Sequence, residues 1–203
     1  KDSGVEWLGE VPEGWDVKKL KYIGNAIIGL TYSPNDIVDE NDGTLILRSS
    51  NIQNGRITLD DNVYVKAEIP HKLITRTGDI LICSRNGSRA LIGKNGIIDD
   101  STAGLSFGAF TTVFRTKFSA FIYYILKSSL FSYQSGRFLT ATINQLTTET
   151  LNSFEIPLPP IQEQTTIAAF LDNETAKIDN LINEQKKLIE LLKEKRQAVI
   201  STA

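Results

Sequence analysis

The sequence has 203 residues, of which 41% are hydrophobic, a formal net charge of −2 and a single cysteine. This length provides for one solid core with material left for an extension, and a single cysteine excludes an intrachain disulfide framework and fits a reducing compartment. Because no apolar run approaches the roughly 20 residues that a membrane-spanning helix needs, and no signal peptide opens the chain, we expect a cytoplasmic protein without a membrane partner.

The charges are unevenly distributed along the chain. Residues 1–61 have 6 Lys/Arg against 11 Asp/Glu, a balance of −5, whereas residues 62–148 have 10 against 4, a balance of +6. Residues 101–148 contain no acidic side chain. A local basic surface of this kind is typical of a nucleic-acid-binding face, and chance clustering on a solvated surface explains it equally well.

Short strands separated by turns are predicted for the first part of the chain. Residues 16–28 mix lysines with apolar side chains and fit either a strand or a short helix. Thr44–Arg48 reads as a buried strand. Gly55–Leu59 reads as another strand, which Asn54 and Gly55 introduce with a turn, because Asn-Gly favours the tight turns of hairpins.

The next predicted strand ends in a polar stretch. Ile80–Cys83 is an apolar, β-rich run, and polar residues 84–89 follow it. Ala90–Gly93 is predicted to resume the strand, so that the polar stretch forms a hairpin tip or a bulge. Hydrogen-bonding side chains are concentrated in this stretch and just after it: Arg85, Asn86, Ser88, Arg89 and Lys94.

One more strand and one helix are predicted before the sequence changes character. Gly108–Phe114 reads as the strand, and apolar residues at helical spacing predict a helix over Phe121–Phe131. Residues 136–150 are loosely patterned and lead to the proline-rich junction Phe154–Pro160.

Beyond this junction, residues 161–203 contain no glycine and no proline, which predicts a single helix roughly 60 Å long. Six of nine heptad core positions are apolar, and Gln185 at a core position is expected to set register. A stripe this long must be buried, and we favour an intermolecular or inter-repeat coiled coil over packing along the same domain. The proposed seam comprises Leu171, Ile178, Leu181, Gln185, Leu188 and Leu192.

Catalytic motifs are missing from the sequence. His71 is the only histidine, and with Cys83 it cannot assemble a four-ligand zinc site. Gly87–Lys94 is similar to a phosphate-binding loop, but five residues lie between its glycines where four are needed. Asn95 also stands where a Ser or Thr would hold magnesium. We therefore interpret the chain as a binding component without enzymatic activity or a cofactor of its own.

Several segments resemble the specificity subunits of type I restriction–modification systems. Glu155–Gln164 together with Ile167–Asp172 closely resembles their conserved region, and Asp2–Trp15 resembles the start of their target recognition domains. Internal landmarks of the same family are similar to Arg48–Ile57, Thr77–Leu81 and Arg85–Ser88, so that the resemblance spans nearly the whole chain.

The resemblance implies an α+β fold: a DNA target recognition domain over residues 1–157 and a long helix over residues 158–203. Subunits of this family carry two such domains, and paired antiparallel helices between them set the distance between two DNA half-sites. The helices also dock methyltransferase subunits, which bind S-adenosylmethionine, and a motor-nuclease subunit uses ATP and Mg. This chain has one domain and one helical region, so it is either a half-size subunit that forms a homodimer or a fragment.

The resemblance also implies a bacterial or archaeal protein that contacts double-stranded DNA through polar loops. Arginine can bind guanine and asparagine can bind adenine, each through two hydrogen bonds, and lysine suits phosphates. An ordinary polar turn or structural connection is the alternative for each loop. The residues that we predict to contact DNA are Arg48, Ser50, Asn51, Arg85, Asn86, Ser88, Arg89, Lys94, Arg137, Thr140, Thr142 and Asn144.

Two rival functions are also consistent with the sequence. A globular domain with a dimerising helix could assemble other proteins without DNA specificity. The chain could also be a detached recognition domain of a fused restriction–methylation enzyme. Salt-dependent, sequence-selective DNA binding separates the first rival from a DNA-reading subunit, because phosphate contacts make affinity fall as salt rises.

Overall fold

Strand β11 (Thr111–Thr116) occupies the second position of the largest sheet in the computed structural model, which describes residues 1–138 and 144–201. It pairs antiparallel with β2 (Gly24–Ile28) on one side and with β8 (Ile80–Cys83) on the other. All four residues of β8 are buried, which explains why its sequence is continuously apolar rather than alternating. The order of this sheet is β2-β11-β8-β9-β6-β5, completed by β9 (Asn95–Ile97), β6 (Arg56–Ile57) and β5 (Ile52–Gln53).

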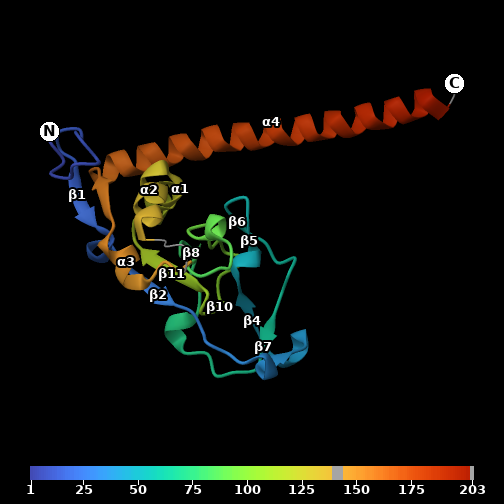
Figure 1. The fold of residues 1–203 in the computed structure, drawn as a ribbon, viewed down its shortest axis with the longest axis horizontal. Coiled ribbons are helices and arrows are strands. Elements are labelled where there is room, and N and C mark those ends of the chain that lie inside the picture. Colours follow the sequence, from blue (N-terminus) through green and yellow to red (C-terminus); the bar gives the residue numbers. More distant parts are fainter. Residues whose placement is uncertain (139–143, 202–203) are drawn as a thin grey trace. The chain divides into compact units, whose positions relative to one another are not determined.

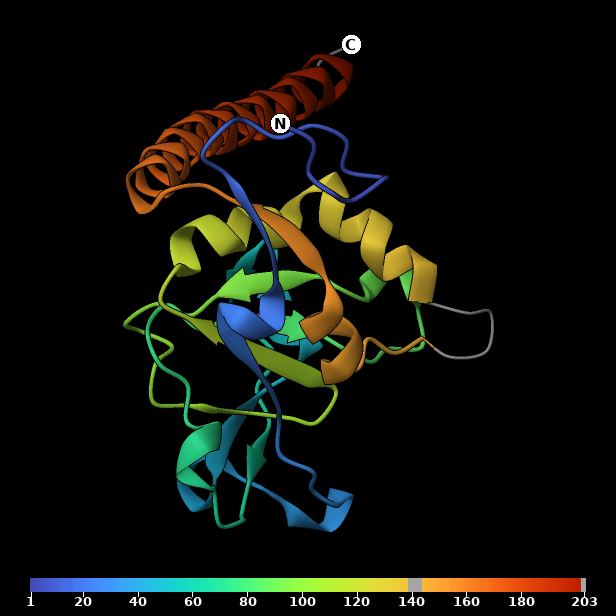
Figure 2. The same ribbon diagram turned by 90° about the vertical axis from the view of Figure 1, so that its left-hand side faces the viewer.

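A four-stranded sheet lies at the other end of the same unit from helices α1 and α2 (Figure 2). Its order is β10-β4-β7-β3, formed by β10 (Ser106–Phe107), β4 (Thr44–Leu47), β7 (Tyr64–Val65) and β3 (Ile37–Val38). β10 and β4 run parallel, although nearly sixty residues separate them in the chain. Fully buried Ile46, Leu47 and Phe107 from these two strands form part of the core.

The start of the chain pairs with the segment that precedes the long helix. β1 (Asp16–Lys19) forms a two-stranded antiparallel sheet with β12 (Glu155–Leu158). Helix α3 (Thr148–Ser153) leads into β12, and the Thr147 hydroxyl caps it by accepting a hydrogen bond from the Thr150 amide at 3.0 Å.

Helices α1 (Ser119–Lys127) and α2 (Ser129–Phe138) follow the sheet strand β11, and α1 packs on β9. The prediction of one helix over residues 121–131 is therefore wrong. Ser128 has an extended conformation, and its hydroxyl donates to the Ile125 carbonyl at 2.7 Å. Serine side chains that bond to nearby backbone in this way compete with helix continuation.

Short 3₁₀ turns link many strands: η1 (Leu20–Tyr22), η2 (Pro34–Asp36), η3 (Glu40–Asp42), η4 (Ser49–Asn51), η5 (His71–Leu73) and η6 (Arg89–Leu91). Turn η6 corrects the prediction that Ala90–Gly93 resumes a strand. Leu91 and Ile92 donate backbone hydrogen bonds three residues back, and Gly93 has a φ of 85°. The chain therefore turns here, and β9 begins only at Asn95.

Other strand predictions hold in position, although several differ from the structure in their bounds. Thr44–Leu47 and Ile80–Cys83 are strands as expected, and Asn54 and Gly55 have φ values of 51° and 77° in the turn between β5 and β6. The predicted strand 55–59 is confined to Arg56–Ile57. The predicted strand 108–114 begins at Thr111, because Thr111 first closes a turn onto the Gly108 carbonyl.

A buried ion pair ties β8 to β11. Asp79 is 2% exposed and accepts hydrogen bonds from Arg115 Nε at 2.8 Å and Nη2 at 2.7 Å. Hydrogen bonding of the Arg115 guanidinium to the Asp79 carboxylate is the main cause that raises the pKa of Arg115. The second Asp79 oxygen also accepts from the Arg76 amide at 2.9 Å, so the carboxylate is well satisfied in the core.

The chain divides into two units, Lys1–Gln164, called the head below, and Thr165–Ala203. The second unit is formed by helix α4 (Ile161–Ser201), 41 residues long, which begins in the head (Figure 1). This length corresponds to about 60 Å, as predicted. No helix within residues 1–138 and 144–201 is long and apolar enough to cross a membrane.

Candidate nucleic-acid interface

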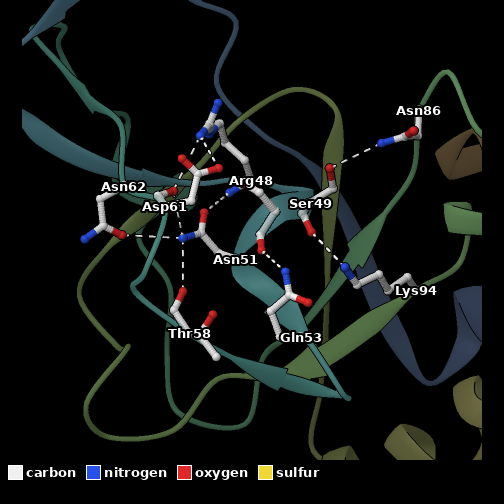
Figure 3. A network of polar contacts seen from close by, with 10 residues as sticks. Arg48, Ser49, Asn51, Gln53, Thr58, Asp61, Asn62, Asn86 and Lys94 are labelled. Carbon is white, nitrogen blue, oxygen red and sulfur yellow. Dashed lines mark hydrogen bonds and ion pairs between the residues drawn. The ribbon is translucent and has the colours of Figure 1, made fainter.

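The turn after β4 is held by the buried side chain of Asn51. Its carbonyl oxygen accepts from the Arg48 amide at 2.9 Å, and its amide donates to the carbonyls of Thr58 at 3.0 Å and Asp61 at 3.2 Å (Figure 3). Asn51 has no exposed surface. The prediction that Asn51 contacts DNA does not fit this burial, and its role is to position the turn.

Arg48 is half-buried and forms an ion pair with Asp61, with 2.9 Å between Nη2 and Oδ2 (Figure 3). This partner could not be identified from the sequence, because thirteen residues separate the two and no local pattern links them. Arg48 Nε and the Ser50 hydroxyl oxygen are buried without a hydrogen-bond partner. Two buried polar atoms of this turn are therefore left unsatisfied in the fold.

Arg48 and Ser50 line a pocket of about 400 Å³ together with Ser49, Tyr32 and Phe110. The Phe110 side chain is 60% exposed, which is unusual for a large aromatic residue. Phe110 was predicted to lie within a strand and was not assigned to the site, because an exposed aromatic and a core aromatic look alike in a single sequence.

The long connection between β8 and β9, residues 84–94, supplies the main group of exposed donors. The Arg85 guanidinium lies 5.2 Å from the centre of the Phe110 ring, a cation–π arrangement. The Arg85 backbone also donates to the Phe110 carbonyl at 3.0 Å and forms an isolated β-bridge with Gln145. Arg85 is thus held at its backbone while its charged end is exposed.

Asn86 and Lys94 join this connection to the turn after β4. Both side chains point toward Ser49 (Figure 3): Asn86 Nδ2 donates to its hydroxyl at 3.4 Å, and Lys94 Nζ donates to its carbonyl at 3.3 Å. Two segments that are about 40 residues apart in the chain therefore form one surface.

The third predicted segment joins the same surface. Asn144 Nδ2 donates to the Gly87 carbonyl at 3.0 Å, and Arg89 Nη2 donates to the Gly136 carbonyl at 3.1 Å. Ser88 is exposed, and Arg137 is exposed near the Tyr133 ring. Thr140 and Thr142 lie outside the described residues.

The electrostatics of this surface favour an anionic ligand. Over the described ranges, Arg85, Arg89, Lys94 and Arg137 form no ion pair with a carboxylate. Guanidinium, ammonium and amide groups beside a flat aromatic ring are the groups that proteins use to contact base edges and phosphates. In the part of the chain that the structure describes, no three His, Cys, Asp or Glu side chains gather as a metal site requires.

The predicted seam of the long helix is exposed in α4 apart from Leu171, which is partly buried. Ile178, Leu181, Leu188 and Leu192 are 48–56% exposed. A single helix cannot cover its own apolar stripe, so α4 described by itself still needs a partner surface.

The chain is similar to known proteins over most of its length, which includes this surface and much of the helix. The family described as "Type I restriction modification DNA specificity domain" matches residues 12–191. The specificity subunit of the type I restriction enzyme EcoKI from Escherichia coli (strain K12) is 32% identical, over 96% of this chain and 43% of the subunit. The StySPI specificity subunit from Salmonella potsdam is 31% identical with the same two coverages.

Solved structures give the same fold. A chain in a structure of a type I R-M system matches with a TM-score of 0.75 at 23% identity, covering 94% of this chain and 45% of that one. The HsdS subunit from Thermoanaerobacter tengcongensis matches with a TM-score of 0.65 at 20% identity, covering 87% and 41%. The chain therefore spans less than half the length of the curated relatives and of these structures.

Proposed function

Because the chain belongs to the family of type I restriction modification DNA specificity domains, we propose that it reads one half of a bipartite DNA site for a type I restriction–modification complex. The observation that carries this proposal is the joining of three polar segments into one surface of the head. Exposed Arg85 and Arg89 and partly buried Lys94 lie on that surface without carboxylate partners among the described residues.

The proposal assigns different tasks to different side chains. Arg85 and Asn86 are suited to base edges, Arg89, Lys94 and Arg137 to phosphates, and Ser88 and Asn144 to either. Asn51 and Asp61 keep the turn after β4 in place and make no contact with DNA. Chemistry belongs to the partner subunits: methyltransferase subunits with S-adenosylmethionine, and a motor-nuclease subunit with ATP and Mg.

Helix α4 then acts as a spacer and docking element. Its exposed apolar stripe supports pairing either with a second copy of the chain or with an equivalent helix of a longer polypeptide. A symmetric pair would carry two heads and read a palindromic split site, since a twofold protein places identical surfaces on both half-sites. The helix length of about 60 Å is less than two turns of B-DNA. No observation favours the assembly protein or the fused enzyme over this function.

The direct test replaces Arg85 and Arg89 by alanine together. In a complex reconstituted with the methyltransferase subunits, methylation of the recognised sequence should fall and its advantage over other sequences should shrink. Each lost base contact is expected to cost about 1–3 kcal/mol of discrimination. Selectivity is measured by mapping methylated sites on genomic DNA.

A matched control replaces Lys72 and Arg76, two exposed basic residues of the head that lie outside this surface, by alanine. The control should keep both rate and selectivity. Equally fast and equally selective methylation by the Arg85→Ala, Arg89→Ala protein would show that the surface is assigned wrongly.

A further inference from the structure

A second pocket, of about 520 Å³, contains three cationic side chains and no carboxylate among its lining residues. Arg89 and Lys94 come from the connection between β8 and β9, and Lys127 comes from the last turn of α1. Lys127 could not be identified from the sequence, because it ends an apolar helix and no motif surrounds it. The pocket is formed entirely within the head.

Each of the three cations is fixed by a neutral acceptor, which leaves its charge uncompensated. Arg89 donates to the Gly136 carbonyl at 3.1 Å, Lys94 to the Ser49 carbonyl at 3.3 Å, and Lys127 to the Tyr123 hydroxyl at 3.0 Å. An ammonium has three N–H donors and a guanidinium has five, so most donors of all three groups are available to a ligand.

The position of Lys127 is set by the turn between β5 and β6. The Tyr123 hydroxyl, which accepts from Lys127, itself donates to the Gly55 carbonyl at 2.6 Å. Lys127 Nζ lies against Gly55 so closely that a Cβ there would be 2.5 Å from it, and the φ of 77° at Gly55 also requires glycine. The ammonium is therefore held in place before any ligand arrives.

The floor of the pocket is rigid as well. Asn95 is 6% exposed, and its amide donates to the carbonyls of Gly93 and Leu126, each at 2.9 Å. These bonds tie β9 to α1, so the loop that carries Lys94 and the helix that carries Lys127 keep a fixed relation to one another.

We propose that this pocket binds a phosphate group of the DNA backbone, and that Lys127 is a phosphate ligand together with Arg89 and Lys94. The inference rests on the proposed function and deepens it. Lys94 lines this pocket and also bonds to the turn after β4, so it connects the pocket to the surface proposed to contact bases. Phosphate contacts fix register and supply affinity without reading sequence. Lys127 should therefore contribute to DNA affinity and leave base preference unchanged.

The test measures the affinity of the full chain, in its complex, for its recognised duplex over a series of salt concentrations. Each lost phosphate contact reduces the slope of log K against log salt by about 0.9 for B-DNA. Lys127→Gln should reduce the slope by this amount, and Lys127→Gln combined with Lys94→Gln by about twice as much. The preference for the recognised duplex over an unrelated one should stay within twofold for Lys127→Gln.

Two further variants separate charge from structure. Lys127→Arg keeps the charge and should keep the slope. Lys21→Gln removes a lysine that lies over the ring of a neighbouring tyrosine, as Lys127 does, but does not line the pocket, so it too should keep the slope. Urea unfolding of each variant checks that the head is intact.

An unchanged slope in a folded Lys127→Gln protein would overturn the inference, while selective binding by the wild-type protein would leave the proposed function standing. If the wild-type protein shows no selective, salt-dependent binding, the proposed function fails first. A second arm titrates inorganic phosphate without DNA, at constant ionic strength. Phosphate binding that depends on Lys127 while the DNA slope does not would place a small free anion in the pocket and also overturn the inference.

Discussion

The head and helix α4 differ in where their apolar side chains lie. In the head, Ile80, Leu81 and Ile82 are fully buried, and even the charged Asp79 is enclosed with its partner. In α4, Leu181, Leu188 and other large apolar side chains are about half exposed. The head therefore has the contacts for a stable fold within itself, whereas the helix depends on burying its stripe against a partner.

The largest effect is expected from Leu181→Asp combined with Leu188→Asp. Each leucine buried in a helix pair contributes about 1.5–3 kcal/mol, and a symmetric pair loses four of them. In the proposed homodimer the two helices should then separate, so that the mass from sedimentation equilibrium falls to one chain. The urea unfolding midpoint of the head should not change.

The control adds the same two charges on the opposite face of the heptad. Asn183→Asp with Gln197→Asp should keep the mass of the pair, since neither position belongs to the seam. An unaltered mass in the leucine variant would mean that α4 does not pair through this stripe.

The next largest effect concerns the head alone. Asp79→Ala leaves Arg115, whose side chain is 19% exposed, without its carboxylate partner. Removing one partner of a buried ion pair costs about 3–5 kcal/mol, which urea unfolding of the head would measure. Asp60→Ala, at an exposed position, should stay within about 0.5 kcal/mol of the wild type. If Asp79→Ala lowered the free energy of unfolding no more than Asp60→Ala does, the ion pair would not be important for the fold.

The smallest effect tests the first turn of α4, which belongs to the head. Trp15 Nε1 donates to Glu163 Oε2 at 2.8 Å in an exposed setting. Trp15→Phe should cost about 1 kcal/mol and raise hydrogen exchange in this turn only. Glu163→Gln keeps an oxygen that can accept this hydrogen bond, so it should keep most of the wild-type protection against hydrogen exchange. Faster exchange throughout the helix would contradict a local role.

Local sequence signals predicted much of the fold. The Asn54-Gly55 turn, the run Ile80–Cys83 and the helix after Pro160 are each set by neighbouring residues, and all three are present. Pairings between distant segments could not be predicted, such as the parallel contact of β10 with β4, because a strand sequence does not specify its neighbour. The apolar run Ala90–Gly93 was too short to distinguish a strand from a turn.

For the site, residue type alone separated polar from apolar segments but not exposed from buried residues. It selected Arg85, Asn86 and Lys94, which the structure brings onto one surface. It also selected Asn51, whose buried side chain forms hydrogen bonds with backbone groups of its own turn. It did not select Phe110 or Lys127. The difference in each case lies in a tertiary contact that only the folded chain reveals.

The pairing of β1 with β12 has a consequence for how such a protein can vary. The polypeptide enters the sheets of the head at Asp16–Lys19 and leaves them at Glu155–Leu158, and these two strands are hydrogen-bonded neighbours. The segment between these two strands therefore begins and ends at adjacent positions in the fold. Loops inside it can lengthen, shorten or be exchanged wholesale without shifting either end, as is general for modules with adjacent termini. The pair of strands β1 and β12 can thus stay unchanged while a segment with a different fold replaces the residues between them.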